Sequence, residues 1–205
     1  MSALSLRRVA EDLASLESFR ELHEKAPTLR SLVIHGCRLS SVRGLPPLSS
    51  LTELNLSSNS LVDLEPASAW SSLGSLRKLD LSSNRLRGAP FVSGATLSAS
   101  SKKKKLRLPS LTHLLLPYNS ISSLAGLSEV CPHLETLDAR GNHRLEPLSV
   151  LGEDLQNLPD LQRLDLHLSG CEDFRIAFGL LPSLQSFDGH TDASEADGGD
   201  DDDDD

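Results

Sequence analysis

Residues 51–61 read LTELNLSSNSL, and this stretch decides the fold. Leucine occupies its first, fourth, sixth and eleventh places, and asparagine occupies the ninth. The same spacing returns in residues 76–86, LRKLDLSSNRL, and in residues 111–121, LTHLLLPYNSI. Weaker copies begin at Leu29, Leu134, Leu161 and Leu184; cysteine replaces the asparagine in the first of them, at Cys37. The chain is therefore built from a repeated unit.

Successive copies start 22, 25, 35, 23, 27 and 23 residues apart. Five of these six gaps lie within the 20–29 residues typical of leucine-rich repeats. Alternation of Leu-x-Leu predicts a short strand with leucines on one face, and one copy alone buries too little surface to be stable. We therefore expect an α/β fold: a leucine-rich-repeat solenoid with a curved parallel sheet on the concave face and a helical or irregular convex side.

The two ends of such a stack must be covered. Leu6, Val9, Leu13, Leu16, Phe19 and Leu22 recur every three or four residues, which predicts an amphipathic helix over residues 5–24. At the other end Phe174, Phe178 and Phe187 follow the last full repeat and are expected to close the core. The predicted organisation is an N-terminal helical cap over residues 1–28, six to seven repeats over 29–189, and an acidic tail over 190–205.

One wide gap interrupts the stack. It contains GAPFVSGATLSASSKKKKLRLP, which is rich in small residues and lysine, and we interpret residues 90–108 as a disordered basic insertion. Lys102, Lys103, Lys104, Lys105 and Arg107 form a compact basic run. This run is a candidate nuclear-localisation signal, and a merely solvated loop is the alternative.

The acidic excess is confined to the C-terminal segment. The formal net charge is −9, and residues 191–205 hold nine acids and no Lys or Arg, so the remaining 20 acids balance the 20 Lys and Arg. The run Asp200, Asp201, Asp202, Asp203, Asp204 and Asp205 is a candidate binding element for lysine-rich proteins, and a solubility appendage is the alternative. We expect this tail not to bind nucleic acid, since it has the wrong charge.

Cellular context follows from the cysteines and from the apolar runs. Cys37, Cys131 and Cys171 are widely spaced and odd in number, which favours a reducing compartment over a disulfide framework or a zinc site. We expect no signal peptide and no membrane span, and the reducing compartment is the cytosol or the nucleus. Taken with the basic run and with the resemblance described next, the expected location is the nucleus, with shuttling to the cytoplasm.

Three segments carry a resemblance to a known family. They are LHEKAPTLRSLVIHGC (22–37), LSEVCPHLETLDARGN (127–142) and FRIAFGLLPSLQSFDG (174–189). With the acidic tail, they resemble the acidic leucine-rich nuclear phosphoprotein family. The resemblance implies histone binding, phosphatase modulation or assistance in nuclear export. The additional N-terminal segment, the lysine insertion and the short tail depart from the family's pattern.

The residue between the last two leucines of each strand points outward and forms a column on the concave face. With Val33 at its start, the column gives the candidate partner-binding residues Asn55, Asp80, Leu115, Asp138, Asp165 and Asp188. The three last carboxylates would repel one another unless a basic partner, or Arg140 and Arg163, compensated them. A docking face for a basic protein and a solubilising surface are both open interpretations.

Catalysis finds little support in the sequence. His113 lies one repeat from Asp80 and Asp138, but we find no activated nucleophile and no glycine-rich phosphate loop. We expect no catalytic residues, no cofactor, no metal and no small-molecule substrate. The favoured function is a monomeric, non-enzymatic scaffold for basic proteins such as histones. The alternative is a structural adaptor in a ribonucleoprotein, phosphatase-regulatory or axonemal complex, with an apolar patch near Val33, Leu115, Pro117 and Tyr118.

Overall fold

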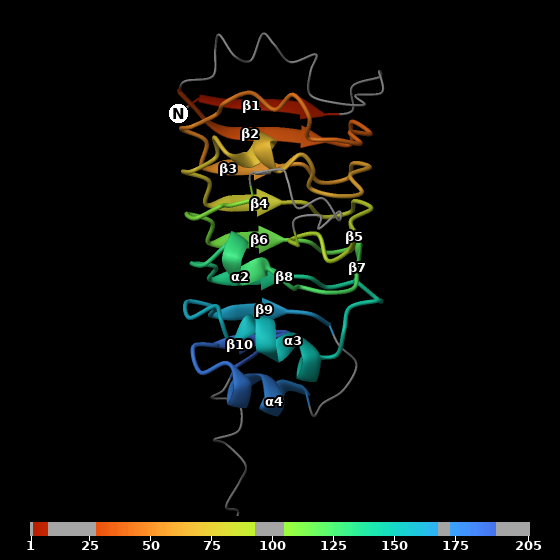
Figure 1. Ribbon diagram of the computed structural model, residues 1–205, viewed down its shortest axis with the longest axis vertical. Coiled ribbons are helices and arrows are strands. Elements are labelled where there is room, and N and C mark those ends of the chain that lie inside the picture. The colour runs from red at the N-terminus through yellow and green to blue at the C-terminus, as the bar shows by residue number, and fades with distance from the viewer. Residues whose placement is uncertain (1, 8–27, 93–104, 168–172, 192–205) are drawn as a thin grey trace, which may run out of the picture.

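The computed structural model describes residues 2–7, 28–92, 105–167 and 173–191. Nine strands form one sheet in the order β1-β2-β3-β4-β6-β8-β9-β10-β11, and they stack along the long axis of the molecule (Figure 1). All neighbours are parallel except the last pair, β10 and β11. The strands are β1 (Ser2–Arg7), β2 (Leu29–His35), β3 (Glu53–Asn55), β4 (Lys78–Asp80), β6 (His113–Leu115), β8 (Thr136–Asp138), β9 (Arg163–Asp165), β10 (Ser186–Phe187) and β11 (His190–Thr191).

The return segments are short helices and irregular chain. A second sheet pairs β5 (Arg87–Gly88) with β7 (Ser120–Ile121). Within the described residues, the helices are the 3₁₀ turn η3 (Ala67–Trp70), α2 (Leu127–Val130), α3 (Leu148–Leu155) and α4 (Asp173–Leu180). A parallel sheet backed by helical and irregular connections is the predicted α/β solenoid, so the expected fold class is confirmed.

The repeated leucines form one continuous core. Leu54, Leu79 and Leu114 are paired across adjacent strands and are at most 1% exposed. Trp70 fills the convex side of this region and donates a hydrogen bond from Nε1 to the carbonyl of Leu64, at 2.8 Å. Because each layer contacts mainly its neighbours, stability accumulates from repeat to repeat.

The asparagines satisfy the turns that follow the strands. Asn84 Nδ2 donates to the carbonyls of Leu56 and Leu81, both at 3.0 Å, and its Oδ1 accepts the N–H of Leu61 at 3.0 Å. Asn59, Asn119 and Asn142 repeat this pattern one layer at a time. Among the described residues, every fully buried side-chain nitrogen or oxygen has a partner. The asparagine ladder therefore links successive turns through otherwise unpaired backbone groups.

We expect Asn84→Ala to lower the free energy of unfolding by about 2–4 kcal/mol, because it leaves several buried backbone groups without partners. Urea denaturation followed by circular dichroism measures this loss. Ser83→Ala, at the neighbouring exposed position, is the control and should change stability by less than about 0.5 kcal/mol. Equal stability of the two variants would contradict the role of the ladder.

The N-terminal prediction was wrong where the structure tests it. Residues 5–7, expected to be helical, belong to strand β1, which pairs with β2 and places Leu4 opposite Leu32. Residues 2–7 also alternate with period two, and pairing satisfies the backbone edge of β2 that would otherwise be open. Leu4 packs against the core. The remainder of the predicted helix, residues 8–24, lies outside the described residues.

The C-terminal end is closed by α4 and β10. Phe187 is buried and Phe178 packs against the core, as predicted. The side chain of Phe174 lies outside the described residues. Residues 190–191, assigned to the tail from sequence, form β11 and pair with β10, so the fold continues to Thr191. The acidic run Asp200–Asp205 lies outside the described residues.

The boundaries of the basic insertion also change. Phe91, Leu106 and Leu108 are buried in the core, so residues 90–92 and 105–108 belong to the folded body. The apolar side chains at both ends of the insertion pack into the core although the segment as a whole is polar. Composition averaged over the segment did not reveal this. Residues 93–104 lie outside the described residues.

The concave face as a candidate binding surface

The predicted outward column is a single row across the sheet. Strand pairing aligns the row without a break through Val33, Asn55, Asp80, Leu115, Asp138 and Asp165. We use the name concave face for this row together with the two flanking rows. One flanking row contains Ser31, Glu53, Lys78, His113, Thr136 and Arg163, and the other contains His35, Ser57, Ser82, Pro117 and Arg140.

Two of the column carboxylates are buried and paired within the chain. Asp138 is 7% exposed and accepts hydrogen bonds from Nε and Nη2 of Arg140, at 3.0 and 2.8 Å. Asp165 is 5% exposed and accepts from Nε of Arg163 at 3.0 Å. The arginine side chains remain about half exposed. The expected compensation by arginines is confirmed, and the surface at β8 and β9 presents guanidinium groups above its carboxylates.

The column is held differently at β3 and β4. Asn55 Nδ2 donates to Asp80 Oδ2 at 2.9 Å, which joins the two strands through their side chains. The other oxygen of Asp80 accepts the N–H of Ser82 at 2.9 Å, and Asn55 Oδ1 accepts the N–H of Ser57 at 2.9 Å. Both side chains are half-buried and oriented by their own turns. They offer a partner a fixed polar surface.

Asp188 is not part of the outward row. It has a left-handed backbone (φ 47°), and its Oδ1 accepts the N–H groups of Leu166 and His167 at 2.7 and 2.8 Å. The Oδ1 atoms of the ladder asparagines accept backbone N–H groups of earlier turns in the same way. The prediction that Asp188 extends a row of partner-binding carboxylates is wrong, since the last turn uses this oxygen as a backbone cap.

A small hollow lies over β2, β3 and β4. Its volume is about 130 Å³. Val33, Asn55 and Asp80 line it, and Glu53 and Lys78 flank it with opposite charges. This part of the concave face is therefore hollowed and polar, with room for a side chain of a partner protein.

The centre of the concave face carries its exposed apolar residues. Leu115 is half-buried and Tyr118 is 69% exposed. Tyr118 has a left-handed backbone (φ 57°), and its ring lies against Gly141. A Cβ on Gly141 would meet Tyr118 Cδ1 at 2.7 Å, and Gly141 is itself left-handed (φ 70°), so only glycine fits here. Pro117, named with this patch from sequence, is buried.

The arrangement gives no support to a catalytic triad. His113 is paired across the sheet with Lys78 and Thr136, and its Nδ1 lies 2.8 Å from the hydroxyl of Thr112. Burial raises the pKa of the Cys131 thiol, so this cysteine stays protonated and unreactive. Among the described residues, no group of His, Cys, Asp and Glu is placed to hold a metal ion. No helix in the described part of the chain has the length and apolarity to cross a membrane.

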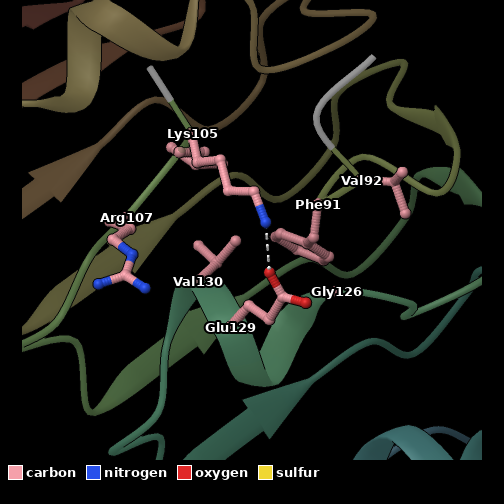
Figure 2. A pocket seen from close by; sticks show the side chains of 8 residues that line it. Phe91, Val92, Lys105, Arg107, Gly126, Glu129 and Val130 are labelled. Carbon is pink, nitrogen blue, oxygen red and sulfur yellow. Dashed lines mark hydrogen bonds and ion pairs between the residues drawn. The ribbon is translucent and has the colours of Figure 1, made fainter. Parts of the chain in front are cut away.

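A larger cavity of about 250 Å³ lies on the helical side, at the base of the insertion. Figure 2 shows Phe91 and Val130 in its wall, with Lys105 and Glu129 joined across it by an ion pair of 3.1 Å. Both charged side chains are about two-thirds exposed, so this pair adds little stability. Arg107 is exposed beside it. Lys102, Lys103 and Lys104, the rest of the candidate localisation run, lie outside the described residues.

Comparison with protein families agrees with this geometry. Residues 27–86 match the family described as leucine rich repeat, and residues 109–153 match leucine rich repeats in two copies. The chain is built of leucine-rich repeats. Such repeats are generally non-enzymatic scaffolds for protein binding.

Curated relatives share the repeats. Over 141 residues the chain is 35% identical to Toll-like receptor 9 of Felis catus, which covers 68% of the chain. It is 32% identical over 126 residues to acidic leucine-rich nuclear phosphoprotein 32-related protein 1 of Oryza sativa subsp. japonica, which covers 60%. It is 34% identical over 184 residues to podocan-like protein 1 of Mus musculus, which covers 79%. The chain spans only 12%, 25% and 32% of the lengths of these relatives, respectively.

Proposed function

We propose that this leucine-rich-repeat chain binds basic proteins such as histones, as a nuclear scaffold or chaperone of the acidic leucine-rich nuclear phosphoprotein type. The observation that carries the proposal is the charge distribution: nine acids and no Lys or Arg lie in residues 191–205, while the rest of the chain is balanced. The rice relative, whose name includes the words acidic and nuclear, supports the same proposal.

The two acidic elements have different roles in this proposal. Asp138 and Asp165 are buried beneath arginines, so the concave face cannot attract a basic partner as a row of free carboxylates. The acidic tail supplies the long-range attraction. The concave face supplies short-range contact through Leu115, the Asn55–Asp80 pair and the hollow over β2–β4.

Leu115→Arg tests whether the concave face makes this contact. It places a positive charge at the centre of the face, and we expect the affinity for core histones to fall by about tenfold or more, as for a central contact residue. Val150→Arg is the matched control, because Val150 is 49% exposed on α3, away from the concave face. Isothermal titration with both variants is the measurement. Equal affinity for the two would exclude the concave face as the contact surface.

A second function is favoured by the exposed aromatic residue. Tyr118 and Leu115 offer an apolar centre to a partner helix or extended segment, as in a structural adaptor of a ribonucleoprotein, phosphatase-regulatory or axonemal complex. Binding of this kind depends on buried apolar area and tolerates salt, whereas binding of a basic partner weakens with salt. The salt dependence of binding therefore separates the two functions.

The proposed location is the nucleus. We expect a fluorescent fusion of the chain to accumulate there, and replacement of Lys102, Lys103, Lys104 and Lys105 by alanine to reduce this accumulation, since the run resembles a localisation signal. The control removes exposed positive charge outside the lysine run, with Arg30→Ala, Arg43→Ala, Arg77→Ala and Arg85→Ala, and should leave the distribution unchanged. The readout is the nuclear-to-cytoplasmic intensity ratio. An unchanged ratio after the lysine replacements would reduce the run to a solvated loop.

A further inference from the structure

Exposed basic residues lie in the segments that follow β4 and β8, the strands on either side of β6, which Tyr118 follows. We name this group the basic edge, and it consists of Arg85, Arg87, Arg140, His143 and Arg144. Its members are neighbours through the backbone: Arg87 pairs with Ser120 across β5 and β7, and the N–H of Tyr118 donates to the carbonyl of Arg140 at 2.9 Å. The ring of Tyr118 lies against Gly141, between the two halves of the group.

The basic edge has few carboxylates to balance it. Residues 82–92 contain two arginines and no acid, and residues 117–128 contain no charged residue. Arg85, Arg87 and Arg144 form no ion pair with any residue that the structure describes, and Arg140 uses Nε and Nη2 on the buried Asp138. Glu146 is the nearest acid on the segment that follows β8. Three of the four arginines of the edge thus have no ion pair within the described residues, on a chain whose net charge is −9.

We propose that the basic edge is the docking site of the acidic segment 192–205 of the same chain. Charge complementarity is the first argument: the segment holds nine acids and the edge holds four arginines and a histidine. Arginine suits this task because its planar guanidinium group binds carboxylates through two parallel hydrogen bonds. Arg140 and Arg144 are the arginines nearest to the start of the segment along the sheet. When the segment is extended, its aspartates also reach Arg85 and Arg87.

The length and starting point of the segment supply the second argument. Thr191 is in register with Ser186, Arg163 and Thr136, three strand spacings from β8, which is about 14 Å. Arg140 lies four residues beyond Thr136, at most about 13 Å along the strand direction, because β8 ends at Asp138 and Arg140 lies in the turn. The direct path to Arg140 is therefore at most about 20 Å, and the nine residues from Thr191 to Asp200 extend up to about 30 Å. The aspartate run reaches the edge without strain.

Docking has a consequence for partner binding. A tail held on the basic edge is less available to a basic partner, so the chain has a docked state and an available state in competition. The local concentration of a tethered segment reaches the millimolar range, which makes even a weak contact populated. The inference goes beyond the proposed function, because the contact forms in the free chain and is measured without any partner.

Paramagnetic relaxation in the full-length, nitrogen-15-labelled chain tests the contact. A nitroxide label is attached in a Gly199→Cys variant that also carries Cys171→Ser; Cys37 and Cys131 are buried and do not react. We expect loss of amide peak intensity at Arg87, Tyr118 and Gly141, and no loss on the opposite edge. At about 1 M NaCl, where the Debye length is about 3 Å, the intensity should return.

Variants of matched charge make the test specific. Arg85→Ser, Arg87→Ser and Arg144→Ser together should abolish the intensity loss. Arg30→Ser, Arg77→Ser and Arg107→Ser remove the same charge from exposed positions outside the basic edge and should preserve it. Absence of intensity loss at the edge, or equal loss in both triple variants, would overturn the proposal. A further experiment mixes nitrogen-14 chain that carries the nitroxide with nitrogen-15 chain that does not. Intensity loss in this mixture would also overturn the proposal, because the occupant would then be a second copy.

Discussion

Replacing Leu79 by alanine is expected to lower the free energy of unfolding by about 2–5 kcal/mol, the range for a buried leucine whose cavity cannot collapse. Leu79 is 1% exposed and is paired between Leu54 and Leu114 on the neighbouring strands. Strand pairing fixes these three positions, so the surrounding leucines cannot move in to fill the space. Leu114→Ala, at 0% exposure, should have an effect of the same size.

Urea denaturation of each variant measures this loss. The matched control is Val62→Ala, because Val62 is a branched apolar residue that is 44% exposed and should contribute less than about 0.5 kcal/mol. A loss below about 1 kcal/mol for Leu79→Ala would contradict a tightly stacked core at this layer.

The second large effect is kinetic. Replacing Asp200, Asp201, Asp202, Asp203, Asp204 and Asp205 by asparagine keeps the length of the tail and removes six charges. Long-range attraction raises association rates by about 10- to 1,000-fold, so we expect the association rate constant with core histones to fall by about tenfold or more at low salt. Stopped-flow mixing measures this rate constant.

The control for this prediction is a chain with Asp63→Asn, Glu65→Gln and Glu153→Gln, which removes exposed acids from the folded body. Its association rate constant should fall by less than that of the tail variant, because three scattered charges produce a weaker field than a contiguous run. If the two variants associate equally fast, the tail does not govern the encounter.

The repeats could be predicted because their physical cause is local. Every leucine of residues 51–61 and 76–86 is buried, and Asn59 and Asn84 make the backbone contacts expected of their position. Few folds are compatible with a fixed apolar pattern that repeats about every 24 residues, because only stacking of the repeats buries the leucines. The C-terminal closure by Phe187 followed from the same reasoning.

The misses have a common cause, which is competition between two local patterns. The apolar residues of segment 2–7 fit both a helix period and a strand period. Hydrogen bonding to β2 stabilises the strand. Asp188 occupies the column position in the sequence, but its Oδ1 accepts two backbone N–H groups of the turn that follows β9. Burial of Asp138 and Asp165 under Arg140 and Arg163 needs side-chain geometry that no spacing provides.

The basic edge was missed although a signal was present. Arg85 directly follows the ladder asparagine Asn84, and His143 directly follows Asn142, so basic residues stand at the same place in two repeats. Reading only the outward column of the strands left this position out. Residues that follow the ladder asparagine lie at the edge where the chain turns off the sheet, and they form a second surface for binding.

The most direct test of the account is the affinity of the full chain for core histones as a function of salt. The account predicts that the dissociation constant of the intact chain rises steeply with NaCl, and that the chain with Asp200–Asp205 replaced by asparagine gives a flatter dependence. Leu115→Arg should weaken binding at every salt concentration. An intact chain that fails to bind at low salt, or binds with an affinity independent of salt, would contradict the account and leave the apolar adaptor in its place.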